Sequence, residues 1–424
     1  MFTTIFVPPQ FRAVLSDHSW LQAMLDVERA LAAAEARAGV IPGDAAERIA
    51  AACHAERFDP VDLAEQGRAA GNPVEPLVRA LTEAVEGDAA RYVHWGTTSQ
   101  DVLDTAAMLV SRDALDLLIE TTDGLARRCA ELADGHRSTL MAARTLLQQA
   151  VPSTFGLKAA GWLVGVLEAR RELLRVRHER LAVQLGGAAG TLAALEDTGP
   201  EVVRAFADDL GLSAPVVPWH TNRVRIAELG GALGLVAGVA AKIGLDVALL
   251  SQTEVDEVAE AAGGVSSTMP QKRNPVASVL AIACARLVNG HVSVLLSALP
   301  QEHERAAGAW HSEWPALSGA LAFAGGTVDA GRRALEGLEV NAERMRSNLW
   351  HSGDLVMAER ASYLLAAEVG RRGGYERVAV AAESGRPLTD ELGLDAAELE
   401  PTSYLGSADA FVDKALAAYR SELG

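Results

Sequence analysis

Two long segments that are rich in apolar residues and poor in turn-forming ones, 223–261 and 275–299, flank one short loop. Leu229–Ala241 is uncharged throughout, which predicts a helix that is buried on all sides. Such a helix needs a bundle around it, preferably one that other subunits complete. Glycine recurs every fourth residue from Gly230 to Gly238. Because each glycine costs a helix about 1 kcal/mol relative to alanine, we expect another backbone to approach that face. The chain is therefore predicted to be all-α.

The composition favours the same fold class. Of the 424 residues, 49% are hydrophobic but only 5% are aromatic, a balance that suits closely packed helices better than a β-sheet body. The formal net charge of −18 argues against nucleic acid as a partner. It also means that an anionic substrate needs a locally positive pocket within an unfavourable overall field.

The sequence also bears on cellular location. The first residues, MFTTIFVPPQFR, lack a charged segment followed by an apolar one and a cleavage site, so no signal peptide is predicted. Leu229–Ala241 holds thirteen uncharged residues, too few to span a bilayer, so no membrane partner is expected. Cys53, Cys129 and Cys284 are scattered without metal-ligand spacing. This usage is typical of reduced thiols, and we expect a cytoplasmic protein.

The loop between the two apolar segments, Ala262–Pro275, reads AGGVSSTMPQKRNP. Within it, Ser266–Asn274 carries hydroxyls, amides and two cations, which fits a moving, anion-binding lid over an active site. The alternative is an ordinary helix start, with Asn274 as the N-cap and Pro275 in the first helical position. On the residues alone, both interpretations stay open.

A second polar stretch, Tyr92–Asp104, reads YVHWGTTSQDVLD. Thr98 and Asp101 have the spacing of a capping-box variant at the start of a helix predicted to run from Ser99 to about Ala133. A helix N-terminus with spare hydroxyls is also a ready carboxylate site, although the residues alone do not separate this role from a plain cap. His94 is either a satisfied loop histidine or a substrate ligand.

Two further stretches are polar. RTLLQQAVPSTF, residues 144–155, places glutamines just before Pro152, which is predicted to start another long helix to about Leu185. QEHERAAGAWHSEW, residues 301–314, suggests a metal site by its composition, but its spacing fits no common ligand set, and we expect a polar patch lining a cleft. Arg144 and Arg305 are candidates for anion pairing, with surface or structural ion pairs as the alternative.

Turn signals predict three domains. Residues 1–93 form a small helical domain, residues 94–345 a long-helix bundle, and residues 346–424 a small C-terminal domain of short helices. The helices expected in the first domain are Leu21–Ala34, Gly43–Cys53 and Val74–Val85.

These motifs resemble those of a known superfamily. SSTMPQKRNP is similar to the GSSxMPxKxNP signature of the fumarase/aspartase superfamily, although Val265 stands where that signature has glycine. HWGTTSQD resembles the first superfamily motif, HxGxTSxD, in full. Residues 144–155 are similar to the second motif, which typically carries a catalytic histidine, but no histidine lies between Arg137 and Arg177. Leu146 and Gln149 occupy the places where different branches have it.

Several stretches look most like one branch, the bacterial 3-carboxy-cis,cis-muconate cycloisomerases: LQAMLDVERALAAAEA, GNPVEPLVRAL, QEHERAAGAWHSEW and YLGSADAFVDKAL. The resemblance implies an all-α, three-domain subunit. It implies a homotetramer with active sites shared between subunits, a small polycarboxylate substrate, and neither a metal nor an organic cofactor. The implied reaction is the lactonising addition of a substrate carboxylate across a diene. The alternatives are a lyase acting on a substituted succinate (adenylosuccinate, argininosuccinate or nitrosuccinate) and a catalytically silent structural protein.

The resemblance and the chemistry together predict the site residues. The expected catalytic residues are Ser266, Lys272 and Gln149, with Ser266 taking part in proton transfer at the carbon next to a carboxylate. The expected substrate-binding residues are His94, Thr97, Thr98, Ser99, Gln100, Thr145, Ser267, Met269, Asn274 and Arg305.

Overall fold

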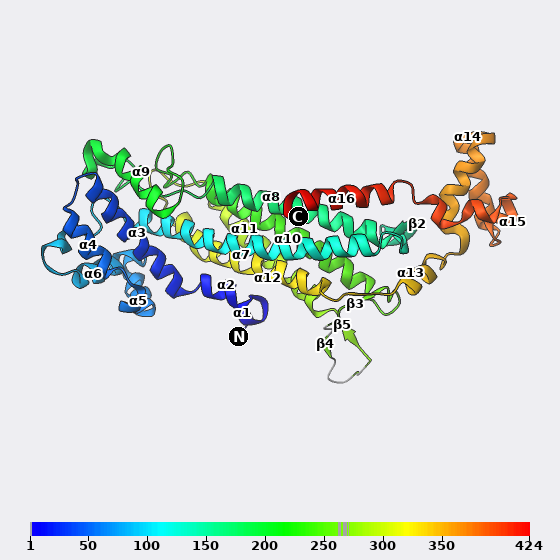
Figure 1. Ribbon diagram of the computed structural model, residues 1–424, viewed down its shortest axis with the longest axis horizontal. Coiled ribbons are helices and arrows are strands. Elements are labelled where there is room, and N and C mark those ends of the chain that lie inside the picture. Colours follow the sequence, from blue (N-terminus) through cyan, green and yellow to red (C-terminus); the bar gives the residue numbers. More distant parts are fainter. Residues whose placement is uncertain (1, 262–263, 266–268, 270) are drawn as a thin grey trace. The chain divides into compact units, whose positions relative to one another are not determined.

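The computed structural model describes residues 2–261, 264, 265, 269 and 271–424 and confirms the all-α prediction (Figure 1). The helices are α1 (Phe2–Phe6), α2 (Pro9–Val14), α3 (Asp17–Arg37), α4 (Gly43–Ala52), α5 (Pro60–Ala70), α6 (Val74–Ala84), α7 (Ser99–Gly135), α8 (Phe155–Glu179), α9 (Gly199–Leu210), α10 (Val224–Leu250), α11 (Val276–Ser297), α12 (Ala309–Leu335), α13 (Ala342–Leu349), α14 (Ala358–Glu383), α15 (Leu388–Leu392) and α16 (Ala408–Leu423). The strands are short: β1 (Leu140–Thr145), β2 (Gln148–Thr154), β3 (Val258–Ala259), β4 (Gly264–Val265), β5 (Arg273–Asn274) and β6 (Glu339–Val340).

The chain divides into two compact units, each made of three separate segments. Unit 1 comprises Met1–Thr121, Ala169–Gly238 and Ala283–Thr327, and unit 2 comprises Thr122–Glu168, Val239–Ile282 and Val328–Gly424. The helices α7, α8, α10, α11 and α12 each supply residues to both units. Each unit therefore draws its core from segments that are far apart in the sequence.

In unit 1, the predicted N-terminal helices are confirmed as α3, α4 and α6. The Ser16 hydroxyl accepts a hydrogen bond from the Ser19 N–H and caps α3, which ends before Gly39 at φ 73°. Ahead of α3, the short helices α1 and α2 pack against α12 where α12 has two glycines. A Cβ at Gly325 would lie 2.6 Å from the Phe11 ring, and one at Gly326 only 2.2 Å from the Phe6 carbonyl oxygen. This close approach thus depends on glycine.

The glycine face of α10 meets side chains rather than another backbone. A Cβ at Gly230 would lie 3.1 Å from the Leu295 side chain of α11, and one at Gly238 would meet nothing within 4 Å. The expected backbone approach at these glycines is therefore wrong within the chain. Burial on all sides is also wrong for the isolated chain, because Leu235 is 56% exposed.

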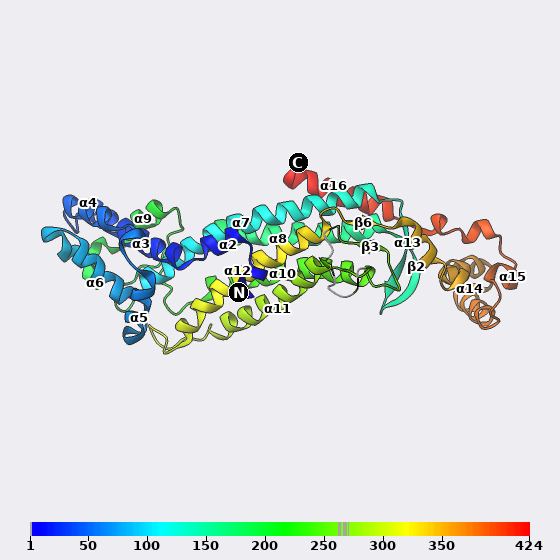
Figure 2. The same ribbon diagram turned by 90° about the horizontal axis from the view of Figure 1, so that it is seen from below.

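In unit 2, polar contacts tie the helices together. The Trp162 indole of α8 donates to Asp246 of α10 at 2.7 Å. The C-terminal helix α16 returns beside α8 (Figures 1 and 2), and Arg137 fixes it through Asp409 at 2.7 Å and Asp413 at 3.1 Å. The last helix is thus attached to Arg137, which follows α7.

Residues 140–154 form an antiparallel β-hairpin where the sequence predicted only a helix start. Pro152 lies in β2, opposite Ala142, and α8 begins three residues later and ends at Glu179 rather than near Leu185. The pairing register shifts between Ala142 and Arg144, so the proline sits beside an irregularity of the ladder. Pro152 is therefore a residue of strand β2 and not the first residue of the helix that follows.

The segment after α10 also differs from the prediction. The helix ends at Leu250, and α7, with 37 residues, is longer than α10. The acidic residues that follow allow two interpretations from the sequence, an approach to solvent or to the site; Glu257 and Glu260 are 0% and 5% exposed, which excludes solvent for both. The Glu260 carboxylate accepts from the Ala277 and Ser278 N–H groups. It therefore caps α11 in place of Asn274, the cap that the sequence suggested.

Length and composition alone would let α10 and α11 cross a bilayer, a test that buried helices of soluble proteins also pass. The uncharged stretch Leu229–Ala241 thus lies within a helix of 27 residues. Within the chain, 44% of the most apolar window of α10 and 28% of that of α11 are buried. Much of their apolar surface is therefore left uncovered by the chain itself.

Replacing Gly326 by alanine should destabilise the protein by about 1–3 kcal/mol, because the new methyl group collides with the Phe6 backbone. Chemical denaturation followed by circular dichroism measures the change. Gly43→Ala is the matched control, since no atom lies within 4 Å of the added Cβ, and it should change stability by less than about 1 kcal/mol. Equal stability of Gly326→Ala and the wild type would contradict this packing.

Candidate active site

The N-terminus of α7 is built around the Asp101 carboxylate, which is 1% exposed. Five groups donate hydrogen bonds to it: the Thr97 hydroxyl (3.1 Å), the Thr98 N–H (3.1 Å), the Gly186 N–H (3.0 Å), the Gly187 N–H (2.8 Å) and His220 Nε2 (2.6 Å). The predicted capping contact between Thr98 and Asp101 is confirmed. Among the described residues, the hydroxyls of Thr98 and Ser99 have no hydrogen-bond partner, so both are available to a ligand.

Behind this helix end, Gln100 is fully buried and supports its neighbours. Its amide donates to Asp104 at 3.1 Å and to the His220 carbonyl at 2.8 Å, and its carbonyl accepts from Arg305 at 3.1 Å. Arg305 also donates to the Ala188 carbonyl at 2.8 Å, but within the described residues it pairs with no carboxylate. The structure thus gives Gln100 protein partners, and it leaves the Arg305 guanidinium without a counter-ion.

A buried charge cluster lies one turn further along α7. Arg223 is 2% exposed and donates to Asp104 at 2.7 and 2.9 Å and to Glu313 at 2.5 and 3.1 Å. The Trp310 indole adds a bond to Asp104 at 3.0 Å, and Gln301 one to Glu313 at 2.9 Å. Burial would lower the pKa of Arg223, but the two carboxylates hold it above its usual range. The cluster joins α7, α12 and the residue before α10, and it therefore fixes the helix end.

His94 is held against α7 by a carboxylate from α3. Its Nδ1 lies 2.5 Å from Oε1 of Glu28, a side chain that is 1% exposed, and its backbone has φ 62°. Burial alone would lower the pKa of His94, but the charge and hydrogen bond of Glu28, with the charge of Asp101, raise it above the ordinary value. A strained backbone and a raised pKa on one residue are typical of functional sites.

Glu35 lies one heptad after Glu28 on α3 and has an unusual environment. It is 1% exposed, and among the described residues neither carboxyl oxygen has a hydrogen-bond partner. Burial, with the charge of Glu28, raises the pKa of Glu35 to about 9. Glu35 is therefore a neutral acid at pH 7.

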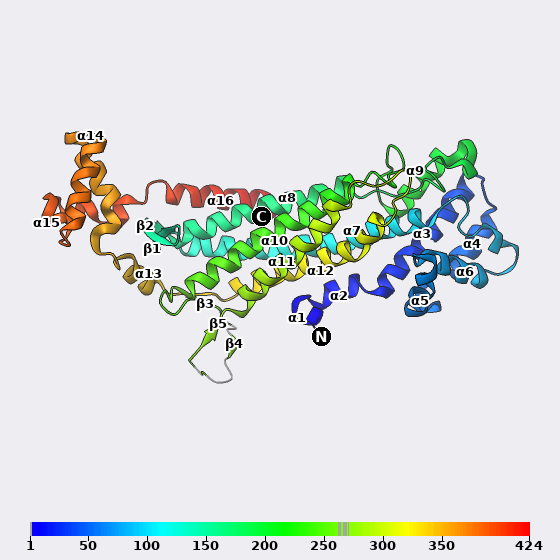
Figure 3. The ribbon, with the colours of Figure 1, turned by 180° about the vertical axis from the view of Figure 1, so that it is seen from behind.

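In unit 2, the predicted lid, residues 262–275, contains the antiparallel strand pair β4–β5, which forms its stem (Figure 3). The Asn274 side chain donates to the Gly264 carbonyl at 3.3 Å, so this amide closes the stem. Arg273 donates to both carboxylate oxygens of Glu339 at 2.9 Å and to the Glu260 carbonyl at 3.3 Å. These contacts anchor the lid to the strand pair β3–β6.

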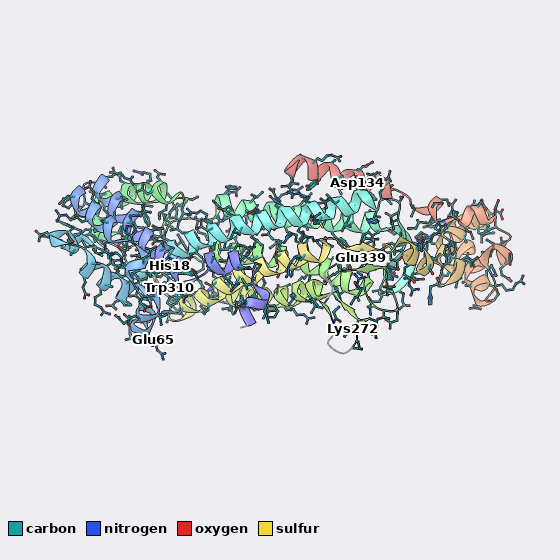
Figure 4. The ribbon with its side chains drawn as sticks, turned by 60° about the horizontal axis from the view of Figure 1, so that its bottom comes forward. His18, Glu65, Asp134, Lys272, Trp310 and Glu339 are labelled. Atoms are coloured by element: carbon teal, nitrogen blue, oxygen red, sulfur yellow. The ribbon has the colours of Figure 1, made fainter. Side chains whose placement is uncertain are left out.

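The tip of the lid is described in part. Ser266 and Ser267 lie outside the described residues. Lys272 and Met269 are both exposed, and the Lys272 N–H donates to the Met269 carbonyl at 3.0 Å. Figure 4 shows Lys272 where β5 begins.

The second motif forms the tip of the β1–β2 hairpin. Thr145 pairs with Gln148, and Leu146 and Leu147 make the two-residue turn with φ 52° and 67°. Such a turn favours glycine or asparagine. The two leucines are also 97% and 76% exposed. A strained turn that presents bare leucines is typical of a tip that contacts a partner or a ligand.

A chain of hydrogen bonds positions this hairpin. The Gln149 amide donates to the Asn348 carbonyl at 2.7 Å, and the Asn348 side chain donates to the buried Glu257 carboxylate at 2.9 Å. Arg144 closes the chain with bonds of 2.6 and 2.9 Å to Glu257. Arg144 is therefore a structural ion pair, the alternative to anion pairing that the sequence left open.

The structure places the predicted site residues in two sets. The set in unit 1 gathers around the start of α7: His94, Thr97, Thr98, Ser99, Gln100 and Arg305. The set in unit 2 divides between hairpin and lid: Thr145, Gln149, Met269, Lys272 and Asn274. Hairpin and lid both attach to the segment 257–260, through Arg144 and Arg273.

Sequence reasoning missed the supporting residues. Glu257 and Asn348 become partners only through the fold, and no local pattern marks them. The half-buried Lys158, whose pKa is lowered chiefly by burial, was also missed. Glu28 did leave a signal, because it is a charged residue on the otherwise apolar face of a predicted helix. Within the described part of the chain, no group of three or more His, Cys, Asp or Glu side chains could hold a metal ion.

Comparisons with known proteins agree on a family. Residues 7–290 match the family described as Lyase. The chain is 46% identical to the 3-carboxy-cis,cis-muconate cycloisomerase of Pseudomonas aeruginosa, over 99% of this chain and 96% of that protein. It is 43% identical to the nitrosuccinate lyase of Streptomyces davaonensis, over 95% and 91%. The crystal structure of the 3-carboxy-cis,cis-muconate lactonizing enzyme from Pseudomonas putida superposes with a TM-score of 0.92, at 41% identity and 99% coverage of both chains.

Replacing Glu35 by glutamine should change how stability depends on pH. Between pH 4.5 and about 9, the folded wild type holds a proton on Glu35 that the unfolded chain has released. This single group therefore lowers the free energy of unfolding by up to about 1.4 kcal/mol per pH unit as the pH rises through that window. Glu35→Gln removes the effect, so its melting temperature relative to the wild type should increase steadily from pH 5.5 to 8.5. A constant difference between the melting temperatures of the two proteins over that range would contradict the prediction.

Proposed function

We propose that this chain, which belongs to the Lyase family of the fumarase/aspartase superfamily, catalyses the lactonising cycloisomerisation of 3-carboxy-cis,cis-muconate. A relative with this activity in its name is 46% identical over nearly the full length of both chains. The solved lactonizing enzyme shares the fold over 99% of both chains. The similarity is therefore full-length and is not confined to a single motif.

The reaction determines what the site must supply. One substrate carboxylate oxygen forms a C–O bond to the diene, and the electrons move onto the carbon next to another carboxylate. That carboxylate carries a second negative charge until a proton is delivered to the adjacent carbon. Fixed hydrogen-bond donors must stabilise this charge. We propose that Ser266 transfers the proton, with Lys272 nearby to stabilise its alkoxide.

The remaining predicted residues would hold the carboxylates. The hydroxyls of Thr98 and Ser99, free among the described residues, and the first N–H groups of α7 suit one carboxylate. Arg305 brings a positive charge without a described counter-ion to the same helix end. We propose Thr97, Gln100 and Asn274 as supports and Thr145, Ser267 and Met269 as further contacts with the substrate. Gln149 and His94 would orient the substrate.

The observation that carries the proposal is the hairpin turn of Leu146 and Leu147. This turn stands where the superfamily typically has a catalytic histidine, and it offers no proton donor. Read in reverse, the cycloisomerisation expels a carboxylate, which is a weak base and leaves without being protonated. A lyase that expels an amine needs an acid at that point. The turn thus favours a reaction with a weakly basic leaving group.

Nitrosuccinate elimination is the second candidate, because nitrite is also a weakly basic leaving group. The nitrosuccinate lyase relative, at 43% identity over 95% of this chain, supports it. Adenylosuccinate and argininosuccinate cleavage both expel nitrogen bases and fit the turn less well. A catalytically silent protein would have no need of Ser266, Lys272 and Asn274 together.

Turnover assays separate these candidates. Incubation with 3-carboxy-cis,cis-muconate should abolish the diene absorbance, while nitrosuccinate should yield no nitrite, and adenylosuccinate and argininosuccinate no fumarate. Nitrite release without loss of diene would move the protein to the second candidate. No reaction with any of the four substrates would contradict both.

Variants at serine test whether the turnover belongs to this site. Ser266→Ala should lower kcat by about 10²–10⁴-fold, the range for loss of a proton-transfer group, without changing the circular dichroism spectrum. Ser403→Ala is the matched control, because this exposed hydroxyl donates to the carbonyl of Glu400 in the C-terminal part of the chain. It should keep full activity.

We further propose a homotetramer with active sites shared between subunits. One row of exposed or half-exposed positions on α10 recurs at alternating intervals of four and three residues and is uncharged except at two of its members, Glu228 and Lys242: Val224, Glu228, Gly231, Leu235, Gly238, Lys242, Leu245 and Leu249. On α11, Val279 is 54% exposed and Leu296 48%. An apolar seam with this spacing is typical of helices that pack against other helices.

We also propose three properties of the protein as a whole. The three-domain division at residues 1–93, 94–345 and 346–424 is one. The second is that no cofactor is needed, since both bond changes proceed by acid–base chemistry. The third is a cytoplasmic location, which the scattered and buried positions of the three cysteines support.

Leu235→Glu should dissociate the assembly, because it places a charge in the centre of the α10 seam. Size-exclusion chromatography with light scattering should then give less than four times the chain mass, and turnover should fall with the mass. Val216→Glu is the control, since Val216 is 99% exposed in the loop between α9 and α10 and is not a member of the seam, so this variant should leave both unchanged. A tetramer of Leu235→Glu with full turnover would contradict the interface.

A further inference from the structure

The contact between His94 and Glu28 has no part in the proton transfer proposed for Ser266. Glu28 comes from the middle of α3 and is 1% exposed, and His94 is held in the loop before α7 with its side chain 18% exposed. Nδ1 of the imidazole lies 2.5 Å from Oε1 of Glu28 and is hydrogen-bonded to it. Nε2 has no hydrogen-bond partner among the described residues. One ring nitrogen is thus fixed and the other is free to bind a ligand.

The environment of the pair favours a charged histidine. Among the described ion pairs, the partner of Glu28 is His94 alone, so an ionised Glu28 in this buried place needs the imidazolium as its counter-ion. The ionisable groups that face His94 are Glu28 from α3 and Asp101 from α7. Behind Glu28 lie Glu35 of α3 and Cys53 at the end of α4, whose own pKa values are raised, to about 9 and about 12. Both are neutral at pH 7, so neither competes with His94 for Glu28.

The backbone points the same way. His94 has φ 62° and Gly96, two residues on, has φ 65°. A histidine in the left-handed region costs conformational energy and persists only where the surroundings hold it. Here the surroundings supply the Glu28 bond on one side and the start of α7 on the other.

We propose that Glu28 is a positioning residue that keeps His94 as an imidazolium cation and presents its free Nε2–H group to a carboxylate of the substrate. This role rests on the function proposed above and deepens it, because it assigns a task to a residue on α3. Together with Arg305, it gives the end of α7 two positive charges within a chain whose net charge is −18. An anionic substrate needs such a local reversal of sign.

The direction of the pH effect follows from the contact. Burial lowers the pKa of His94, and Glu28 more than offsets that effect. In the wild type, the cation therefore persists as the pH rises past the ordinary histidine value and is lost only at the raised pKa. In Glu28→Gln the burial remains and the carboxylate charge is gone, so the cation is lost at a lower pH.

Kinetics with 3-carboxy-cis,cis-muconate between pH 5.5 and 9 test this proposal. In Glu28→Gln the alkaline limb of kcat/KM should move down by at least about one pH unit, and KM at pH 7.5 should rise about tenfold, with kcat within about threefold of the wild type. Glu28→Asp keeps the charge and should restore the limb to within about half a unit. Glu35→Gln is the control on the same helix: Glu35 is already neutral, so the limb should stay in place.

A second measurement reads the histidine itself and needs no turnover. In protein labelled at histidine Cε1, the NMR resonance of His94 is assigned by its loss in His94→Gln, and its titration is followed in the wild type and in Glu28→Gln. The His94 pKa should fall by at least one unit in Glu28→Gln. An unchanged titration overturns the proposal, and so does a lowered pKa with unchanged KM and limb.

Two further outcomes separate this proposal from the others. If the wild type does not turn over 3-carboxy-cis,cis-muconate, the proposed function fails, while the titration still decides whether Glu28 sets the charge of His94. If Glu28→Gln folds poorly by circular dichroism, Glu28→Asp and His94→Gln carry the test. His94→Gln should raise KM at pH 6.5 about tenfold with little change in kcat, and an unchanged KM overturns the proposal.

Discussion

The Asp101 carboxylate holds the first-motif end of α7 in one arrangement. It is buried and accepts five hydrogen bonds, from two residues just before the helix, two glycine N–H groups and His220. One turn further along α7, Arg223 lies between Asp104 and Glu313 and fixes the same helix to α12. A buried charge costs stability unless it is fully paired, so these groups tolerate few alternative arrangements. The donors of the helix end are thereby preorganised, which is what stabilisation of a developing charge requires.

The electrostatics of unit 1 follow from the same pairing. The chain is strongly acidic, yet the carboxylates nearest the helix end have partners within the protein: Asp101 has five donors, His220 among them, and Glu28 has His94. Arg305 is bound through a neutral amide and a carbonyl and so keeps its charge for a ligand. A polycarboxylate would therefore meet positive charge and free hydroxyls at this end in spite of the net charge of −18.

The order of helices was largely predictable, because a period of 3.6 residues and end signals such as Gly39 or Thr98 are local properties. The β1–β2 hairpin was missed. Its turn consists of two leucines where asparagine and glycine are usual, and its proline resembles a helix start. From the sequence, the acidic run after Leu250 could face either solvent or the site, and in the structure Glu257 and Glu260 are buried. Their partners, Arg144 and the N-terminus of α11, could not be recognised from the sequence around them.

By itself, the sequence determined the all-α class, the superfamily, and the polar stretches that carry the candidate site, since each depends on residues that are close together in the chain. Only the tertiary structure decided how those residues are used. Arg144 pairs with Glu257 inside the chain, and Gln100 is a buried support. The Arg305 guanidinium is without a described carboxylate partner, and Nε2 of His94 is without a described hydrogen-bond partner. The physical reason is that a polar group's role depends on whether the fold supplies it with a partner. Those partners, such as Glu28 for His94 or Glu257 for Arg144, lie 66 and 113 residues away along the chain.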